Sequence, residues 1–345
     1  MNGGKTSDAH PWTDPDRDIV VGVDGSQESF AALRWALREA SLTSRRVNAV
    51  YGWTRSWQMG PEPHDDAGWA KARAQISAQL RQWADTASQG LKSSRDSLTL
   101  TSVHASGTSA LLELGSNAQQ IVVGRRSLGP VARWLTGSLS SSLAEEAQVP
   151  VTIVKTPSDE TSSVRAMIAR TLRTSSVSRK PDGIPANPGD GSPDSGTGID
   201  TADTDPSKPI VVGVDGSTTS LRALDFASDM AATHHRPLRI MMCWQLRDLG
   251  TIPGYERAVA PLDEVQRYVQ GKVDEIATHA HAARDCDVQA YAFHIPAAQG
   301  LIDASRYASH IVVGTRGLNG INAHFLGSVS RRIVDLSECS ATIVH

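Results

Sequence analysis

Apolar residues along the chain gather in short continuous runs that alternate with longer amphipathic stretches. Residues 18–24 form a run rich in Val and Ile, which is typical of a strand buried on both faces of a sheet. Ser26 follows as a candidate helix N-cap, and Phe30, Leu33 and Leu37 then recur near a period of 3.6. The pattern therefore predicts a buried strand followed by an amphipathic helix.

The same alternation continues along the first half of the chain. Further strands are predicted at residues 47–53, 98–103, 121–124 and 151–154, and further helices at residues 70–91, 110–117 and 138–146. Five strands joined by helical crossovers predict a parallel sheet that is covered by helices on both faces. The expected fold class is therefore a doubly wound α/β domain.

An internal duplication extends this prediction to the second half of the chain. Residues 19–26, IVVGVDGS, recur letter for letter at residues 210–217, an offset of 191. Later matches share an offset of 190: residues 121–124 with 311–314, and residues 137–138 with 327–328. The period is far too long for a solenoid, so we expect two tandem copies of one domain.

The segments between and before the copies differ in composition. Residues 180–207 contain five Pro, five Gly and six Asp, and so bury too little apolar surface to fold. The segment just before them predicts a short basic helix, which either packs on its own domain or docks a partner: Val164, Met167, Ile168 and Leu172 lie at helical spacing among arginines. The expected segments are a disordered tail at 1–17, a first domain at 18–156, a linker with this helix and a disordered tether at 157–208, and a second domain at 209–345.

Composition and charge narrow the class of protein further. With 39% hydrophobic residues and a net charge of −3, the chain is typical of a soluble globular protein rather than a nucleic-acid binder. No run of about 18 apolar residues predicts a membrane span, and residues 1–18 lack the apolar core of a secretory signal. Three widely spaced cysteines favour a reducing compartment without a CxxC metal site, so we expect a cytoplasmic protein.

The candidate chemistry lies in two segments that follow buried strands. Open α/β sheets bind ligands at the carboxyl ends of their strands, so the turn at residues 214–217 should meet the segment after the fourth strand. In the second copy that segment reads GTRG at 314–317, then nine residues, then GSVS at 327–330. Glycine lets backbone N–H groups approach a ligand closely, and the helix predicted after Gly327 attracts anions at its N-terminus.

The polar residues of these segments favour a nucleotide pocket. Ser328 and Ser330 offer hydroxyl donors and Arg316 offers positive charge, which suits phosphate. Asp215 is anionic, so it is better suited to accept hydrogen bonds from a ribose hydroxyl or an adenine amino group. The structural alternative is that the glycines only make turns and the serines only cap helices. Because both motifs occur twice with the same spacing, we favour the nucleotide pocket.

These motifs resemble those of the universal stress protein family. The segments IVVGVDGS and IVVGTRG…LGSVS are similar to that family's adenine-nucleotide motif, Gly-x₂-Gly-x₉-Gly-Ser/Thr. The resemblance implies a five-stranded parallel sheet of order 3-2-1-4-5 in each domain, ATP as the ligand, and a regulatory role in stress or growth arrest. It also implies that the domains pair through their last strands, at residues 151–154 and 342–344, and is consistent with a homodimer of such chains.

The resemblance also assigns residues to the site. In the second copy, Asp215 and Gly216 would lie at the ribose or base and Cys243 would offer its backbone to adenine. The phosphates would be held by Gly314, Arg316, Gly317, Gly327, Ser328, Val329 and Ser330. The matching residues of the first copy are Asp24, Gly25, Gly52, Gly124, Gly137, Ser138, Leu139 and Ser140. No catalytic residue and no protein metal site are expected, and whether Mg²⁺ accompanies the nucleotide is left open.

The first copy departs from the motif at its second glycine, where Ser127 stands. If that position needs a positive φ, serine there costs about 1 kcal/mol or more. Pro130 removes a donor, and Arg125 and Arg126 add charge that either compensates or obstructs. We therefore expect weaker nucleotide binding in the first copy. Two alternative functions stay open: a slow ATPase or phosphotransferase, and an interaction scaffold with vestigial pockets.

Overall fold

The computed structural model describes residues 10–54, 65–91, 97–125, 138–156, 205–281, 286–317 and 326–345. The first copy alternates strands and helices as the sequence predicts. Its strands are β1 (Ile19–Gly22), β2 (Val47–Gly52), β3 (Leu98–Val103), β4 (Gln120–Arg125) and β5 (Val151–Lys155). Its helices are α1 (Gln27–Thr43), α2 (Asp66–Ser88), α3 (Gly107–Gly115) and α4 (Ser138–Glu146).

The second copy repeats the same order of elements. Its strands are β6 (Ile210–Gly213), β7 (Leu238–Cys243), β8 (Val288–Phe293), β9 (His310–Gly314) and β10 (Ser340–Val344). Its helices are α6 (Thr218–Thr233), α7 (Leu262–His281), α8 (Ala297–Ala304) and α9 (Ser328–Leu336), with a short 3-10 turn η5 (Leu246–Asp248). None of the described helices is long and apolar enough to cross a membrane.

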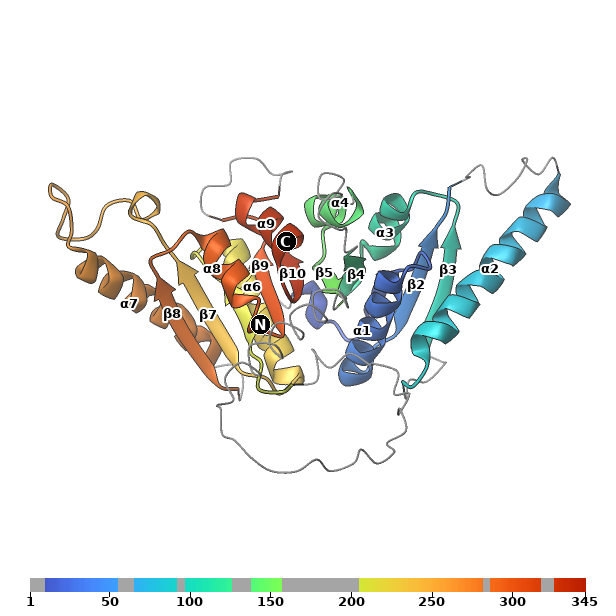
Figure 1. Cartoon of the computed structure of the whole chain (residues 1–345), viewed down its shortest axis with the longest axis horizontal. Helices are drawn as coiled ribbons and strands as arrows, with labels where there is room; N and C mark the ends of the chain where they lie inside the picture. The colour runs from blue at the N-terminus through green and yellow to red at the C-terminus, as the bar shows by residue number, and fades with distance from the viewer. Residues whose placement is uncertain are drawn as a thin grey trace, which may run out of the picture. The chain divides into compact units, whose positions relative to one another are not determined.

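All ten strands join in one sheet of order β3-β2-β1-β4-β5-β10-β9-β6-β7-β8 (Figure 1). Within each copy the strands are parallel and follow the order 3-2-1-4-5, which confirms the expectation from the family resemblance. The copies meet where β5 and β10 pair antiparallel, with Thr152 opposite Thr342. The predicted pairing through the last strands is therefore confirmed.

The two faces of the sheet carry two separate apolar cores. Buried residues of α1, α2, α6 and α7 form one cluster, with Leu33 and Leu80 among its fully buried members. Buried residues of α3, α4, α8 and α9 form the other, around Leu111 and Leu143. Strand residues alternate between the clusters because successive side chains point to opposite faces. This explains why the strands read as continuous apolar runs.

A chain of four buried polar side chains crosses the junction between β5 and β10. The Oγ1 atoms of Thr152 and Thr342 lie 2.8 Å apart. Thr152 donates to Oε1 of Gln120 at 2.6 Å, and Nε2 of His310 lies 2.7 Å from Oγ1 of Thr342. Since Thr152 uses its proton on Gln120, Thr342 donates to Thr152 and the N–H of His310 donates to Thr342. His310 is neutral in this arrangement, and its complete burial lowers its pKa to about 3.

A segment before β1 also bridges the two copies. Residues 10–17 contain a 3-10 turn, η1 (Pro11–Thr13), and the side chain of Trp12 within it is buried. The Trp12 ring lies edge-on to Phe226 of α6, with centroids 5.8 Å apart, and stacks on His10 at 4.4 Å. Trp12 thereby joins the core on the α1 and α6 face of the sheet.

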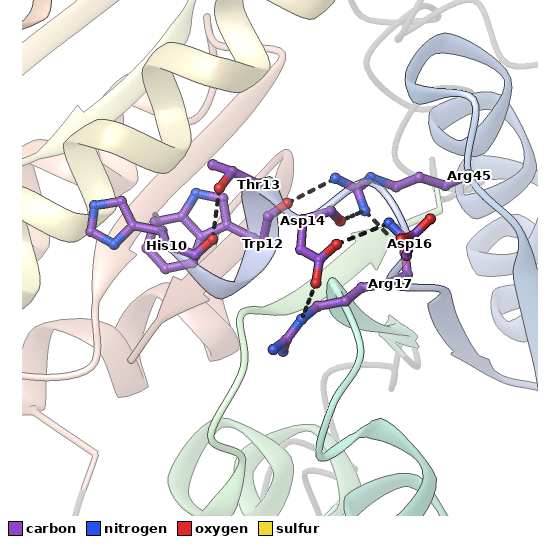
Figure 2. Close-up of polar contacts among 7 residues, drawn as sticks. All are labelled: His10, Trp12, Thr13, Asp14, Asp16, Arg17 and Arg45. Atoms are coloured by element: carbon purple, nitrogen blue, oxygen red, sulfur yellow. Dashed lines mark hydrogen bonds and ion pairs between the residues drawn. The ribbon is translucent and has the colours of Figure 1, made fainter. Parts of the chain in front are cut away.

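Arg45, just after α1, holds this segment from the side of the first copy (Figure 2). Its guanidinium donates to the carbonyls of Trp12 and Arg17 at 3.0 Å each, and also to the carbonyl of Asp14. The expectation of a disordered tail at 1–17 is therefore wrong for residues 10–17, because one buried indole and one arginine order them. The predicted basic helix and most of the linker lie outside the described residues.

The neutral state of His310 predicts a loss of stability in acid. The pKa of a histidine is ordinarily 6.5, whereas burial holds that of His310 near 3. Between these values the unfolded chain binds a proton that the folded chain excludes. The free energy of unfolding then falls with decreasing pH, by up to about 1.4 kcal/mol per pH unit from this group. His310→Gln should flatten that part of a denaturant-unfolding profile measured from pH 4 to 7, and an unchanged slope would contradict the neutral assignment.

The burial of Trp12 predicts that its removal weakens the whole unit. Trp12→Ala should lower the free energy of unfolding by about 3–5 kcal/mol, because it leaves a cavity between the two copies. Val259→Ala is the matched control, since Val259 is 88% exposed. Urea unfolding measures both variants, and equal midpoints for the two would show that residues 10–17 do not stabilise the junction.

Candidate functional site

The turn after β6 and the segment after β9 meet at the carboxyl ends of their strands. A Cβ atom on Gly317 would lie only 2.2 Å from Oδ2 of Asp215, so backbone and carboxylate are in direct contact there. The hydroxyl of Thr219, in the first turn of α6, donates to the carbonyl of Arg316 at 2.6 Å. The turn after β6 and the segment after β9, which the sequence analysis singled out, therefore lie side by side and form one surface.

Local turn geometry fixes the carboxylate of Asp215. Its Oδ1 accepts a hydrogen bond from the backbone N–H of Ser217 at 2.9 Å. Gly216 between them has a φ of +86°, a left-handed conformation that favours glycine. Ser217 in turn caps α6 by accepting from the N–H of Ser220 at 3.3 Å. The second oxygen of Asp215 is thus held toward Gly317.

The N-terminus of α9 lacks the side-chain cap that α1 and α6 have. Ser26 and Ser217 cap those two helices, whereas the N-cap of α9 is Gly327, which has no side chain to offer. The first N–H groups of a helix need partners, and an anion is a suitable one. Ser328 at this end is exposed, so the residues present fit a phosphate group.

Ser330 and Gly314 were expected to contact the phosphates, but they hold α9, β9 and α6 together instead. Ser330 is buried and its hydroxyl donates to the carbonyl of Gly314 at 2.7 Å, which fastens α9 to β9. Gly314 has no room for a side chain, because a Cβ there would lie 2.9 Å from the carbonyl of Thr219. The hydroxyl proton of Ser330 is therefore committed, and only its backbone N–H remains for a ligand.

Cys243 ends β7 with its side chain turned into the protein. Its Sγ would lie 2.7 Å from a Cβ on Gly300 of α8, and burial raises the pKa of the thiol to about 12. Only its backbone is left for a base. Next to it, Trp244 stacks on His294 at 4.3 Å, and Trp53 stacks on His104 at 4.3 Å in the first copy. The sequence analysis missed these pairs, although His104 and His294 share the offset of 190.

Comparison with known proteins decides the family. The model of the universal stress protein family matches residues 17–155 and again residues 206–345. The chain belongs to the universal stress protein family. A universal stress protein of Mycolicibacterium smegmatis is 26% identical over 333 residues, which cover 95% of this chain and 96% of that one. One from Mycobacterium tuberculosis is 26% identical over 355 residues, covering 95% and 94%.

Solved structures of this family share the fold. The universal stress protein from Archaeoglobus fulgidus DSM 4304 has a TM-score of 0.57 and 13% identity, with 95% of this chain and 97% of that chain covered. A universal stress protein solved in complex with cAMP is 28% identical and covers 40% of this chain and 97% of its own, with a TM-score of 0.31. The full-length match supports the arrangement of two family domains in one chain.

The first universal stress domain differs from the second at the turn after β1. Gly25 has a φ of +83°, like Gly216, but a Cβ on it would lie 2.6 Å from the ring of Trp83 of α2. No described residue lies within 4 Å of the same position on Gly216. A Cβ on Gly52, the counterpart of Cys243, would lie 2.7 Å from the Cα of Gly107, just as the side chain of Cys243 packs against Gly300 of α8. Among the described residues, the turn after β1 is therefore covered by Trp83, whereas no side chain covers the matching turn after β6.

The other candidate residues of the first domain also serve the fold. Gly124 packs against the carbonyl of Glu28, which a Cβ would approach to 2.2 Å, as Gly314 packs in the second domain. Asp24 accepts from the N–H and the hydroxyl of Ser26 at 3.0 and 2.5 Å. Leu139 packs against the core of its face, and Ser140 follows it in α4. Gly137 and the side chain of Ser138 lie outside the described residues, as do Ser127 and Pro130.

Arg125 resolves one question that the sequence left open. Its guanidinium donates to the carbonyl of Val334 at 3.1 Å, at the end of α9 in the other domain. Burial lowers its pKa, and the carboxylates of Asp335 and Glu338 act against that change. The charge of Arg125 is therefore used at the junction of the domains, and Arg126 lies outside the described residues.

The argument from backbone strain at the second motif glycine is wrong. Gly317 is not among the described residues with positive φ. Glycine is required there because a side chain would collide with Oδ2 of Asp215. Ser127, at the matching position of the first domain, lies outside the described residues, so weaker nucleotide binding there stays a prediction.

The two serines at the start of α9 are expected to differ in how much each contributes to the stability of the fold. Ser330→Ala should lower the free energy of unfolding by about 1–3 kcal/mol, because it removes the buried hydrogen bond from this hydroxyl to the carbonyl of Gly314. Ser328→Ala is the matched control and should leave that free energy unchanged, because its side chain is exposed. Thermal unfolding measures both variants. The reverse order of stabilities would show that the hydrogen bond of Ser330 does not fasten α9.

Proposed function

We propose that this chain binds ATP in its second universal stress domain and regulates a partner or its own conformation through the occupancy of that site. The observation that supports this most is the contact of Asp215 with Gly317 beside the N-terminus of α9, which has no side-chain cap. Membership of the family supports a role in stress response or growth arrest. The proposal places this role in the cytoplasm.

Each part of the nucleotide has a suitable group in the proposed site. The backbone beside Cys243 offers hydrogen bonds to adenine, and the carboxylate of Asp215 accepts from ribose hydroxyls. The N–H groups of Ser328 and Val329 at the start of α9 meet phosphate, assisted by the helix dipole. Arg316 adds positive charge at the same end. These residues bind and orient a nucleotide, which suits a regulator.

The first domain is proposed to serve as the structural partner of the second. Trp83 covers Gly25, and Arg125 reaches into the second domain. These contacts favour the scaffold hypothesis for this half of the chain alone. One nucleotide per chain follows from this division.

Replacing Gly317 tests the proposal. Gly317→Ala should weaken ATP binding by about tenfold or more, because the new methyl group collides with Asp215 and displaces either the carboxylate or the loop. Gly271→Ala is the matched control, since nothing lies within 4 Å of a Cβ at that position in α7. Isothermal calorimetry on the full chain measures both. Equal ATP affinities for the two variants would contradict a site at this contact, as would wild-type protein that binds no nucleotide.

A further inference from the structure

Hydroxyl groups from two helices hold the loop that follows β9. The hydroxyl of Thr219, in the first turn of α6, donates to the carbonyl of Arg316 at 2.6 Å. The hydroxyl of Ser330, in α9, donates to the carbonyl of Gly314 at 2.7 Å. These helices lie on opposite faces of the sheet, because α6 packs in one apolar core and α9 in the other. Two peptide groups of the loop are therefore fixed from opposite sides.

The bond from Thr219 sets the direction of the peptide group between Arg316 and Gly317. In a trans peptide the C=O and the N–H point in opposite directions, and none of the described peptide bonds is cis. The carbonyl of Arg316 points to Thr219, so the N–H of Gly317 points away from α6. On the other face, α9 begins beside the same loop, since the N–H of Gly327 donates to the carbonyl of Thr315 at 2.8 Å. The N–H of Gly317 is thus directed to the side on which α9 begins.

A second hydroxyl supports Thr219 as a donor. Oγ of Ser217 lies 3.3 Å from Oγ1 of Thr219. Since Thr219 gives its proton to the carbonyl of Arg316, Ser217 is the donor in this pair. In the first copy the matching serine, Ser26, donates its hydroxyl proton to Oδ1 of Asp24 at 2.5 Å instead. Only in the second copy does a line of hydrogen bonds among the described residues run from the helix cap through a threonine to the loop.

The first copy has a glutamate where the second has Thr219. At the offset of 191 the counterpart of Thr219 is Glu28, in the first turn of α1. Both residues adjoin the loop after the fourth strand of their copy. A Cβ on Gly124 would lie 2.9 Å from the Cβ of Glu28, and a Cβ on Gly314 would lie 2.9 Å from the carbonyl of Thr219. An ionised carboxylate has no proton to donate and repels phosphate, so the two copies differ in what this position offers an anion.

We infer that Thr219 is a positioning residue for phosphate: its hydroxyl directs the N–H of Gly317 toward the start of α9, so that loop and helix bind one anion together. The inference rests on the proposed function and names a residue that makes the second domain competent. Backbone N–H groups bind an anion more tightly when they already converge, because the loop then need not be ordered on binding. Glu28 supplies no such donor and adds a negative charge to the first domain.

Calorimetry on the full chain with ATP and with adenosine tests this inference. Thr219→Val keeps the shape of the side chain but lacks the hydroxyl, and it should weaken ATP binding by about fivefold, the usual effect of one hydrogen bond. Adenosine has no phosphate, so its affinity should not change. Thr219→Ser retains the hydroxyl and should keep the ATP affinity of the wild type. Thr219→Glu, which introduces the residue of the first copy, should weaken ATP binding by about a hundredfold, because like charges are brought together.

Thr278→Val is the matched control. The hydroxyl of Thr278, in α7, also donates to a backbone carbonyl at 2.6 Å, that of Glu275. The same substitution there removes a hydrogen bond of equal length in the same domain. Since α7 packs against β7 and β8, this variant should leave both affinities unchanged.

The outcomes separate this inference from the proposed function. Wild-type protein that binds no ATP overturns both. Wild-type binding of ATP that Thr219→Val leaves unchanged overturns the role of Thr219 alone. An equal loss for ATP and adenosine also overturns it, because the disturbance is then not confined to the phosphate. A loss in Thr219→Ser as large as in Thr219→Val does so too, since the hydroxyl is then not the group that acts.

Discussion

The antiparallel contact between β5 and β10 is the interaction on which the rest of the structure depends. Each copy by itself would end its sheet in a strand with unpaired N–H and C=O groups, which is an aggregation hazard. Their pairing satisfies both edges and buries Thr152 and Thr342 against each other. Gln120 and His310 complete the polar chain on either side, so burial leaves these hydroxyls satisfied.

That contact also explains why two similar copies diverge. Once the domains are joined, residues of one can serve the other, as Arg125 does at the end of α9. The turn after β1 is then covered by Trp83, while the matching turn after β6 stays open. Duplication thus allows one copy to stabilise the unit and the other to present a ligand surface.

The sequence predicted the bounds of the strands and helices more accurately than the contacts between them. The strand at 98–103 and the helix at 138–146 were predicted to the residue, because alternation and helical spacing report directly which positions are buried. Ser26 was predicted as an N-cap and is one. The topology came from the family resemblance, since local patterns do not say which strands are neighbours.

The contacts that distinguish the two copies had no local signal. Trp12 is a single large apolar residue in a polar segment, and its burial depends on Phe226 of α6, which is far away in the sequence. The meeting of Trp83 with Gly25 depends on how α2 packs against α1 and β3. The motif glycine at 317 was recognised, but its physical reason, contact with Asp215, required the fold.

The number of nucleotides bound per chain tests the division between the copies most directly. Full-length protein purified without added nucleotide is first examined by native mass spectrometry, and its denatured extract identifies any bound molecule. Stripped protein is then titrated with ATP by calorimetry. One ATP per chain is expected, because Trp83 covers the turn after β1, whereas no described residue covers the turn after β6. Two equivalent sites, or none, would contradict a single competent domain.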